Sequence, residues 1–151
     1  MNFSENNIYK DAKNTSSVKG ALILEYPVEH FSSTMAKFKL DIFSYNDGSS
    51  VSFDISCYDY YAETDVGGKP NEWYRSTVIQ YGGKERIPVS FGRRKESLIP
   101  VIVIGTVDTI WYYPLVMIRD IMTRSEIDKE SIFNKRIING FTDNIDDIEY
   151  G

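Results

Sequence analysis

The chain has one cysteine and one histidine, and this scarcity excludes much of the chemistry that proteins build from side chains. A single cysteine, Cys57, cannot form a disulfide within the chain. A zinc site needs several Cys and His ligands, so Cys57 and His30 together are too few. Cys57 alternates in phase with Val51, Phe53 and Ile55, so we expect a small buried side chain. No residue pattern links it to His30 as a nucleophile to its base.

Clustered positive charge and long apolar runs are also missing. The chain has 17 Lys and Arg against 22 Asp and Glu, and its only basic cluster is Arg93-Arg94-Lys95. Phosphate groups and anionic lipids are bound by clustered Lys and Arg, so we expect neither nucleic acid nor a membrane surface as the main partner. The longest apolar stretches, such as Ile99 to Gly105, are too short to span a bilayer. The polar segment from Met1 to Ser17 lacks the apolar core of a signal peptide, so we expect a protein made in a cytoplasm.

Motifs of catalytic and cofactor sites are absent from the sequence. The pairs Gly67-Gly68 and Gly82-Gly83 lack the following helix that would aim backbone amides at a phosphate. The acidic residues of 143–149 do not have the spacing of a calcium-binding loop, so we expect a solvated acidic end. The sequence therefore predicts no enzyme, no cofactor and no metal site.

Aromatic residues and alternating segments are what the chain has in quantity. Aromatic residues make up 14% of it, carried by eleven Tyr, eight Phe and two Trp. Apolar and polar residues alternate from Met35 to Tyr45 and again from Val51 to Tyr60. An Asp-Gly turn, Asp47-Gly48, lies between the two segments. Alternation on both sides of such a turn predicts a β-hairpin.

Further runs of β-branched and aromatic residues predict an all-β protein. We expect residues 1–19 to form a flexible N-terminal arm and residues 20–151 to form one domain. That domain is predicted to be an antiparallel β-sandwich, jelly-roll-like, of about seven to eight strands. Gly92 to Glu96 is predicted to be a charged hairpin tip, and Ser125 to cap a turn or two of helix. The other expected strands lie at about 20–26, 73–80, 87–91, 100–104, 111–123 and 136–142.

One aromatic group is the candidate binding site. It flanks the Gly-Pro loop of residues 62–71, and its residue types suit stacking on sugar rings or contact with another protein. The alternative is that these side chains pack the core of the sandwich or seal an oligomer. The group consists of Tyr58, Tyr60, Tyr61, Trp73 and Tyr74.

Three consecutive segments resemble a module of bacteriophage tail-fibre and tail-spike proteins. They are Val89 to Arg93, Ile99 to Gly105 and Asp108 to Val116. In that module the pattern is roughly a V-R-F-G hairpin, an apolar strand ending I-G-E-T, and a T-x-W-S-Y-P-x-V strand. Tyr112 departs from the pattern, because a small residue usually stands there.

The likeness continues upstream and covers about residues 20–123. Gly20 to Leu24, Met35 to Phe38 and Ser56 to Tyr60 are similar to a G-A-I-x-I-x-L-P strand, an S-x-T-M strand and a G-Y-x-Y strand of those fibres. Residues 126–151 match nothing in the module.

The resemblance implies a fibre or spike component of a virion, commonly a homotrimer, without catalysis in this module. Its expected partners are other virion proteins and a host surface, where a glycan is one candidate receptor. The N-terminal arm is then expected to attach the domain to the virion, and residues 1–18 to be dispensable for folding. Two alternatives remain: a capsid, neck or tail decoration protein that binds only other virion proteins, and a carbohydrate-binding module.

Overall fold

The computed structural model describes residues 8–10, 17–25, 34–44, 50–61, 71–97, 99–125 and 138–150. These residues form twelve β-strands and no helix, which confirms the all-β prediction. The strands are β1 (Ile8–Lys10), β2 (Ser17–Lys19), β3 (Ala21–Glu25), β4 (Thr34–Phe43), β5 (Val51–Tyr61), β6 (Asn71–Gly82), β7 (Val89–Arg94), β8 (Pro100–Ile104), β9 (Ile110–Tyr112), β10 (Leu115–Ser125), β11 (Ile138–Thr142) and β12 (Ile148–Tyr150).

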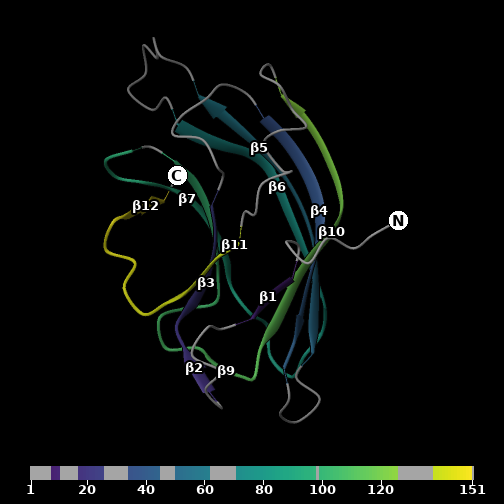
Figure 1. Ribbon diagram of the computed structural model, residues 1–151. Helices are drawn as coiled ribbons and strands as arrows, with labels where there is room; N and C mark the ends of the chain where they lie inside the picture. Colours follow the sequence, from purple (N-terminus) through teal and green to yellow (C-terminus); the bar gives the residue numbers. More distant parts are fainter. Residues whose placement is uncertain are drawn as a thin grey trace.

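The strands build two antiparallel sheets that face each other as the layers of a sandwich (Figure 1). Sheet 1 has the strand order β1-β10-β4-β5-β6, and sheet 2 has the order β11-β3-β8-β7-β12. A small third ribbon pairs β2 with β9. The expected hairpin is confirmed as β4 and β5, which pair from Ile42 with Val51 to Thr34 with Asp59. Its turn lies outside the described residues.

The core between the sheets follows from the alternation seen in the sequence. On β4 the buried residues include Phe38 and Leu40, and on β5 they include Phe53 and Ile55. Side chains of successive strand residues point to opposite faces, so the residues between them form the outer face of sheet 1. Cys57 is buried in this core, as expected.

Sheet 2 is covered on both faces, which explains why β3 and β8 are continuous apolar runs. Leu22 and Ile102 face sheet 1, whereas Ile23 and Val103 belong to a second apolar cluster on the opposite face. The C-terminal segment 143–150, here called the strap, packs on that second face through side chains that include Ile148. In Figure 1 it is the yellow segment that leads into β12.

The strap corrects the prediction of a solvated acidic end. Ile148 is 5% exposed, and Ile145 packs against the same cluster. The strap also continues sheet 2, because β12 pairs with the end of β7 from Ile148 with Arg94 to Tyr150 with Gly92. The acidic residues of the strap therefore alternate with isoleucines that are part of the fold.

Three further predictions differ from the structure in part or lie partly outside the described residues. Parts of the expected flexible arm are strands: β1 pairs with β10 and β2 pairs with β9, so sheet hydrogen bonds hold both. Ser125 is the last residue of β10, and the helical turns that it was expected to cap lie in residues 126–137, outside the described residues. The charged hairpin tip is confirmed in part: Lys95 and Glu96 lie in the exposed turn between the paired strands β7 and β8, whereas Arg93 and Arg94 belong to β7, and Arg93 is buried at 4% exposure.

Candidate functional site

The expected aromatic group lies on two neighbouring strands at one end of sheet 1. Backbone pairing places Tyr58 directly opposite Tyr74 and Asp59 opposite Trp73. It also places Tyr60 opposite Glu72 and Tyr61 opposite Asn71. The backbone thus brings the five aromatic residues onto adjacent stretches of β5 and β6. Of the five, only the side chain of Tyr58 is among those that the structure describes, and it is partly buried.

The middle of the outer face of sheet 1 carries a network of charged and polar side chains. Arg119 Nε donates to Asp41 Oδ2 at 2.5 Å, and Ser52 Oγ donates to Asp41 Oδ1 at 2.7 Å. Next to it, Lys39 Nζ lies 3.5 Å from Asp54 Oδ1. Tyr81 donates its hydroxyl to Asp54 Oδ2 at 3.2 Å. The network links β10, β4, β5 and β6.

Asp41 is held ionised by its neighbours. Burial alone would raise the pKa of its carboxyl group, because a charged group is poorly solvated in the protein. The hydrogen bonds from Arg119 and Ser52, together with the positive charges of Arg119 and Lys39, outweigh burial and lower the pKa of Asp41. The same hydrogen bond from Arg119 raises the pKa of that guanidinium group.

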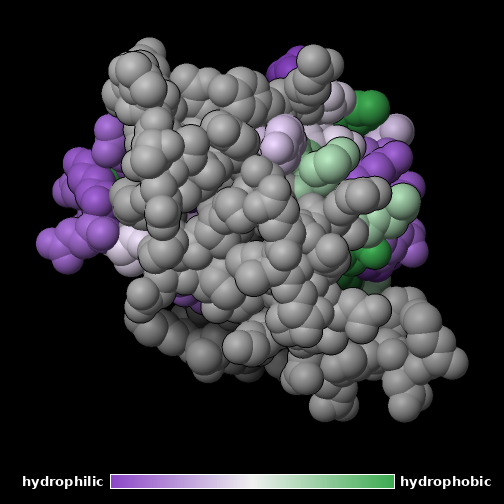
Figure 2. Space-filling model, turned by 90° about the horizontal axis from the view of Figure 1, so that it is seen from above, coloured by the Kyte–Doolittle hydropathy of each residue, from purple (hydrophilic) through white to green (hydrophobic). Residues whose placement is uncertain are grey.

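Apolar side chains surround this polar network. Figure 2, which looks down on the sandwich, shows hydrophobic atoms interspersed with hydrophilic ones on the right flank, the side of sheet 1, and a mostly hydrophilic left flank. The chain's four methionines include Met35, Met117 and Met122, and all three lie on this outer face, opposite Tyr58, Asp41 and Lys37. Of ten exposed large apolar residues in the described part of the chain, six lie here: Met35, Phe43, Ile79, Tyr81, Leu115 and Met122.

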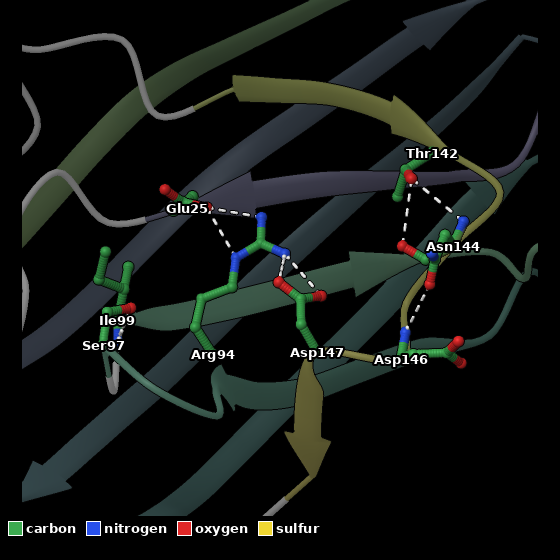
Figure 3. Close-up of polar contacts among 8 residues, drawn as sticks. All are labelled: Glu25, Arg94, Ser97, Ile99, Thr142, Asn144, Asp146 and Asp147. Carbon is green, nitrogen blue, oxygen red and sulfur yellow. Dashed lines mark hydrogen bonds and ion pairs between the residues drawn. The ribbon is translucent and has the colours of Figure 1, made fainter.

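Arg94 forms the second charged site, on the far side of the sandwich. Its guanidinium group lies between Glu25 of β3 and Asp147 of the strap (Figure 3). Nη2 donates to Glu25 Oε2 at 2.7 Å, and Nη1 donates to Asp147 Oδ2 at 2.9 Å. Arg94 therefore fastens the strap to sheet 2. A hollow of about 370 Å³ beside it is lined by Asn139, Asn144 and their neighbours.

A wider groove, of about 680 Å³, opens where β6 leads into β7. Its walls include Val78, Ile87 and Val89. Gln80 fixes the connection: its side-chain amide donates to Glu85 O at 2.7 Å and accepts from Ile87 N at 2.7 Å. The two glycines of this turn have φ values of 77° and 79°, a region that non-glycine residues rarely adopt.

The described residues contain no group of three or more His, Cys, Asp or Glu side chains that could hold a metal ion. No helix in the described ranges is long and apolar enough to cross a membrane. His30 lies outside the described residues. The described residues form two networks of ion pairs and one partly apolar sheet face.

Sequence reasoning missed the outer face of sheet 1, although its pattern contained a sign of it. Met35 and Phe43 stand at the same alternate positions as Lys37, Lys39 and Asp41, where a solvated sheet face would be polar. Leu115 and Met117 share the positions of Arg119 in the same way. No protein-family model, curated protein or solved structure matches the chain.

Proposed function

We propose that the chain is a structural protein of a bacteriophage virion, of the tail-fibre type, that contributes to attachment to the host surface. It acts by binding and assembly and not by catalysis, and it needs no cofactor. Its partners are other virion proteins and further copies of itself in a homotrimer.

The order of the fibre-like segments on the fold supports this proposal. Val89 to Arg93 falls in β7, Ile99 to Gly105 spans β8, and Asp108 to Val116 spans β9 and the start of β10. β7 and β8 are antiparallel neighbours, paired from Val89 with Ile104 to Arg93 with Pro100. Two of these three segments thus each contain one strand, and the third spans parts of two strands of the β-sandwich.

The single observation that carries an assembly role is the partly apolar outer face of sheet 1. Phe43 is 60% exposed and Met122 is 68% exposed on a sheet face that would normally be polar. Large exposed apolar side chains gathered on one face of a protein and bordered by polar residues mark a site of interaction. Virion proteins bury such surfaces against one another.

The direct test is whether the protein is part of the particle. Virions of the phage that encodes the chain are purified on a density gradient, analysed by mass spectrometry, and labelled with gold-conjugated antibody against the purified protein. We expect the chain in the particle and the gold at the tail. A chain that is abundant in the lysate but missing from purified virions would contradict the proposal.

Attachment is tested separately by competition. An excess of purified protein should slow the adsorption of phage to host cells. Particles that carry the protein but whose adsorption is unaffected would favour the alternative of a decoration protein that binds only other virion proteins.

A carbohydrate-binding role is the second candidate, because β5 and β6 place Tyr58 directly opposite Tyr74. Aromatic residues opposite each other on a sheet can offer a surface on which sugar rings stack. Tyr74→Ala should then weaken binding to host polysaccharide by tenfold or more on a glycan array. Unchanged binding by this variant would remove the carbohydrate-binding candidate.

A further inference from the structure

The two sheets of the sandwich differ in what covers their outer faces. The outer face of sheet 2 is closed by the strap, with Ile145 and Ile148 against Ile23 and Val103. No described segment of the chain lies over the outer face of sheet 1. Its apolar side chains are nevertheless as large as those that the strap buries on the other side.

Both ends of the outer face of sheet 1 are apolar. At one end Phe43 pairs across the strands with Leu115, and at the other Met35 pairs with Tyr58. Methionine is frequent on surfaces that adapt to a protein partner, because its side chain is flexible and polarisable. The three methionines of the face are therefore better explained by a protein partner than by a rigid small ligand.

The area of the face fits a protein interface. Four strands spaced about 4.8 Å apart and about ten residues long give a projected area of about 600 Å². The true contact area of such a corrugated surface is larger, and a stable interface buries about 800 Å² on each partner. One sheet face against another is therefore enough for a specific complex.

The charges of the face favour a second copy of the same chain as that partner. The chain carries a formal net charge of −5, so two copies repel each other over most of their surfaces. On this face acidic and basic side chains are paired: Lys39 with Asp54, and Arg119 with Asp41 and Asp120. The face is thus one where like chains can approach without repulsion.

We propose that copies of this chain associate through the outer face of sheet 1. Packed sheets prefer nearly aligned strands, which a rotation axis parallel to the strands provides. Such a rotation preserves height along the strands, so each row of residues across the sheet meets the same row of the next copy. The central row runs Arg119, Lys39, Asp54, Ile79. The rotation reverses the order of this row in the facing copy, and Lys39 and Asp54 are its two middle members. Lys39 of one copy therefore faces Asp54 of the next.

A charge swap tests this contact. Mass is measured by light scattering during gel filtration, from about 1 to about 100 µM, for wild type, Lys39→Asp, Asp54→Lys and the double variant. Each single change puts like charges in contact between copies and should weaken association at least tenfold. The double variant restores opposite charges and should restore the wild-type mass. Circular dichroism establishes that each variant is folded.

A matched pair elsewhere on the surface serves as the control. Lys19 and Asp108 form an exposed ion pair between β2 and the β8–β9 connection, at 3.7 Å. Lys19→Asp and Asp108→Lys make the same chemical changes away from sheet 1 and should leave the mass unchanged.

A further variant guards against unfolding caused by the swaps. Ile79→Lys adds a cation beside Asp54 of its own chain, where the fold tolerates it, but opposite Arg119 of the next copy. It too should reduce the mass. A wild-type protein that is monomeric at about 100 µM, or an oligomer whose mass is unchanged by every variant on this face, would overturn the proposal.

The surface does not depend on the proposed function, whereas the number of copies does. An equimolar mixture of Lys39→Asp and Asp54→Lys forms only favourable contacts in a dimer. A closed ring of three must contain at least one contact between identical variants, so the mixture restores a trimer incompletely. Full recovery of the wild-type mass by the mixture would therefore support this interface and count against a fibre trimer. Partial recovery would support both the interface and the trimer.

Discussion

At the scale of single residues, Asp41 has the largest set of interactions on the outer face of sheet 1. Its pKa is lowered in the fold, so its contribution to stability is present above the unfolded-state pKa and is lost as the pH falls through the folded-state pKa. Asp41→Asn should cost about 0.5–1 kcal/mol at pH 7, because the pair is half exposed. Urea unfolding at pH 7 and again below pH 3.5 should show this difference shrinking in acid. A constant difference would contradict the role given to the carboxylate.

Arg94 is the residue on which the strap depends electrostatically. Its guanidinium group bridges two acids from separate segments and is itself only 19% exposed. Arg94→Met should lower the free energy of unfolding by about 1–2 kcal/mol, since charge-assisted hydrogen bonds are lost to the partly buried carboxylate of Glu25 and to the more exposed carboxylate of Asp147. The control is Arg86→Met on the exposed β6–β7 connection, which should change stability by less than about 0.5 kcal/mol. Equal losses in the two variants would argue against a clamp.

At the scale of elements, the strap needs Gly92 in the neighbouring strand. A Cβ atom at position 92 would lie 2.6 Å from Glu149 O, inside the β7–β12 pairing. Gly92→Ala should therefore push β12 away and cost about 1–3 kcal/mol. Gly92→Ala should speed hydrogen exchange in β12 but not in β4 and β5. The control Ser90→Ala, also in β7, should leave hydrogen exchange in β12 unchanged. Undiminished protection of β12 would mean that the strap is held by other contacts.

The N-terminal strands give a second prediction at this scale. A chain that starts at Gly20 lacks β1 and β2, which pair with β10 and β9. We now expect such a chain to fold but to melt lower by about 3–8 °C, since each kcal/mol lost lowers the melting temperature by about 2–4 °C at this size. An unchanged melting temperature would mean that β1 and β2 contribute nothing to stability and that the N-terminal segment is dispensable for folding.

The elements also show what the sequence could and could not predict. The β4–β5 hairpin was predictable because alternation and its turn residues are local. The strap was not, because its two isoleucines, Ile145 and Ile148, pack against Ile23 and Val103 far away in the chain. Arg94 looked like part of a hairpin tip for the same reason: its partners Glu25 and Asp147 are distant in sequence. The candidate aromatic group lies on the adjacent strands β5 and β6, and its role in binding stays a prediction.

At the scale of the whole molecule, the sandwich has one outer face closed by its own chain and one outer face open to a partner. A fibre-type virion protein would use the open face of sheet 1 for assembly. The ends of the sandwich beyond that face then remain available for contact with a host surface. Assembly and recognition are thereby assigned to different parts of one small domain.

The most direct test of this account is the mass of the purified wild-type protein in solution by light scattering. The account predicts a stable particle of three chains of 17.4 kDa each, present at micromolar concentration and dispersed by Lys39→Asp. A particle of one chain at every concentration would contradict it.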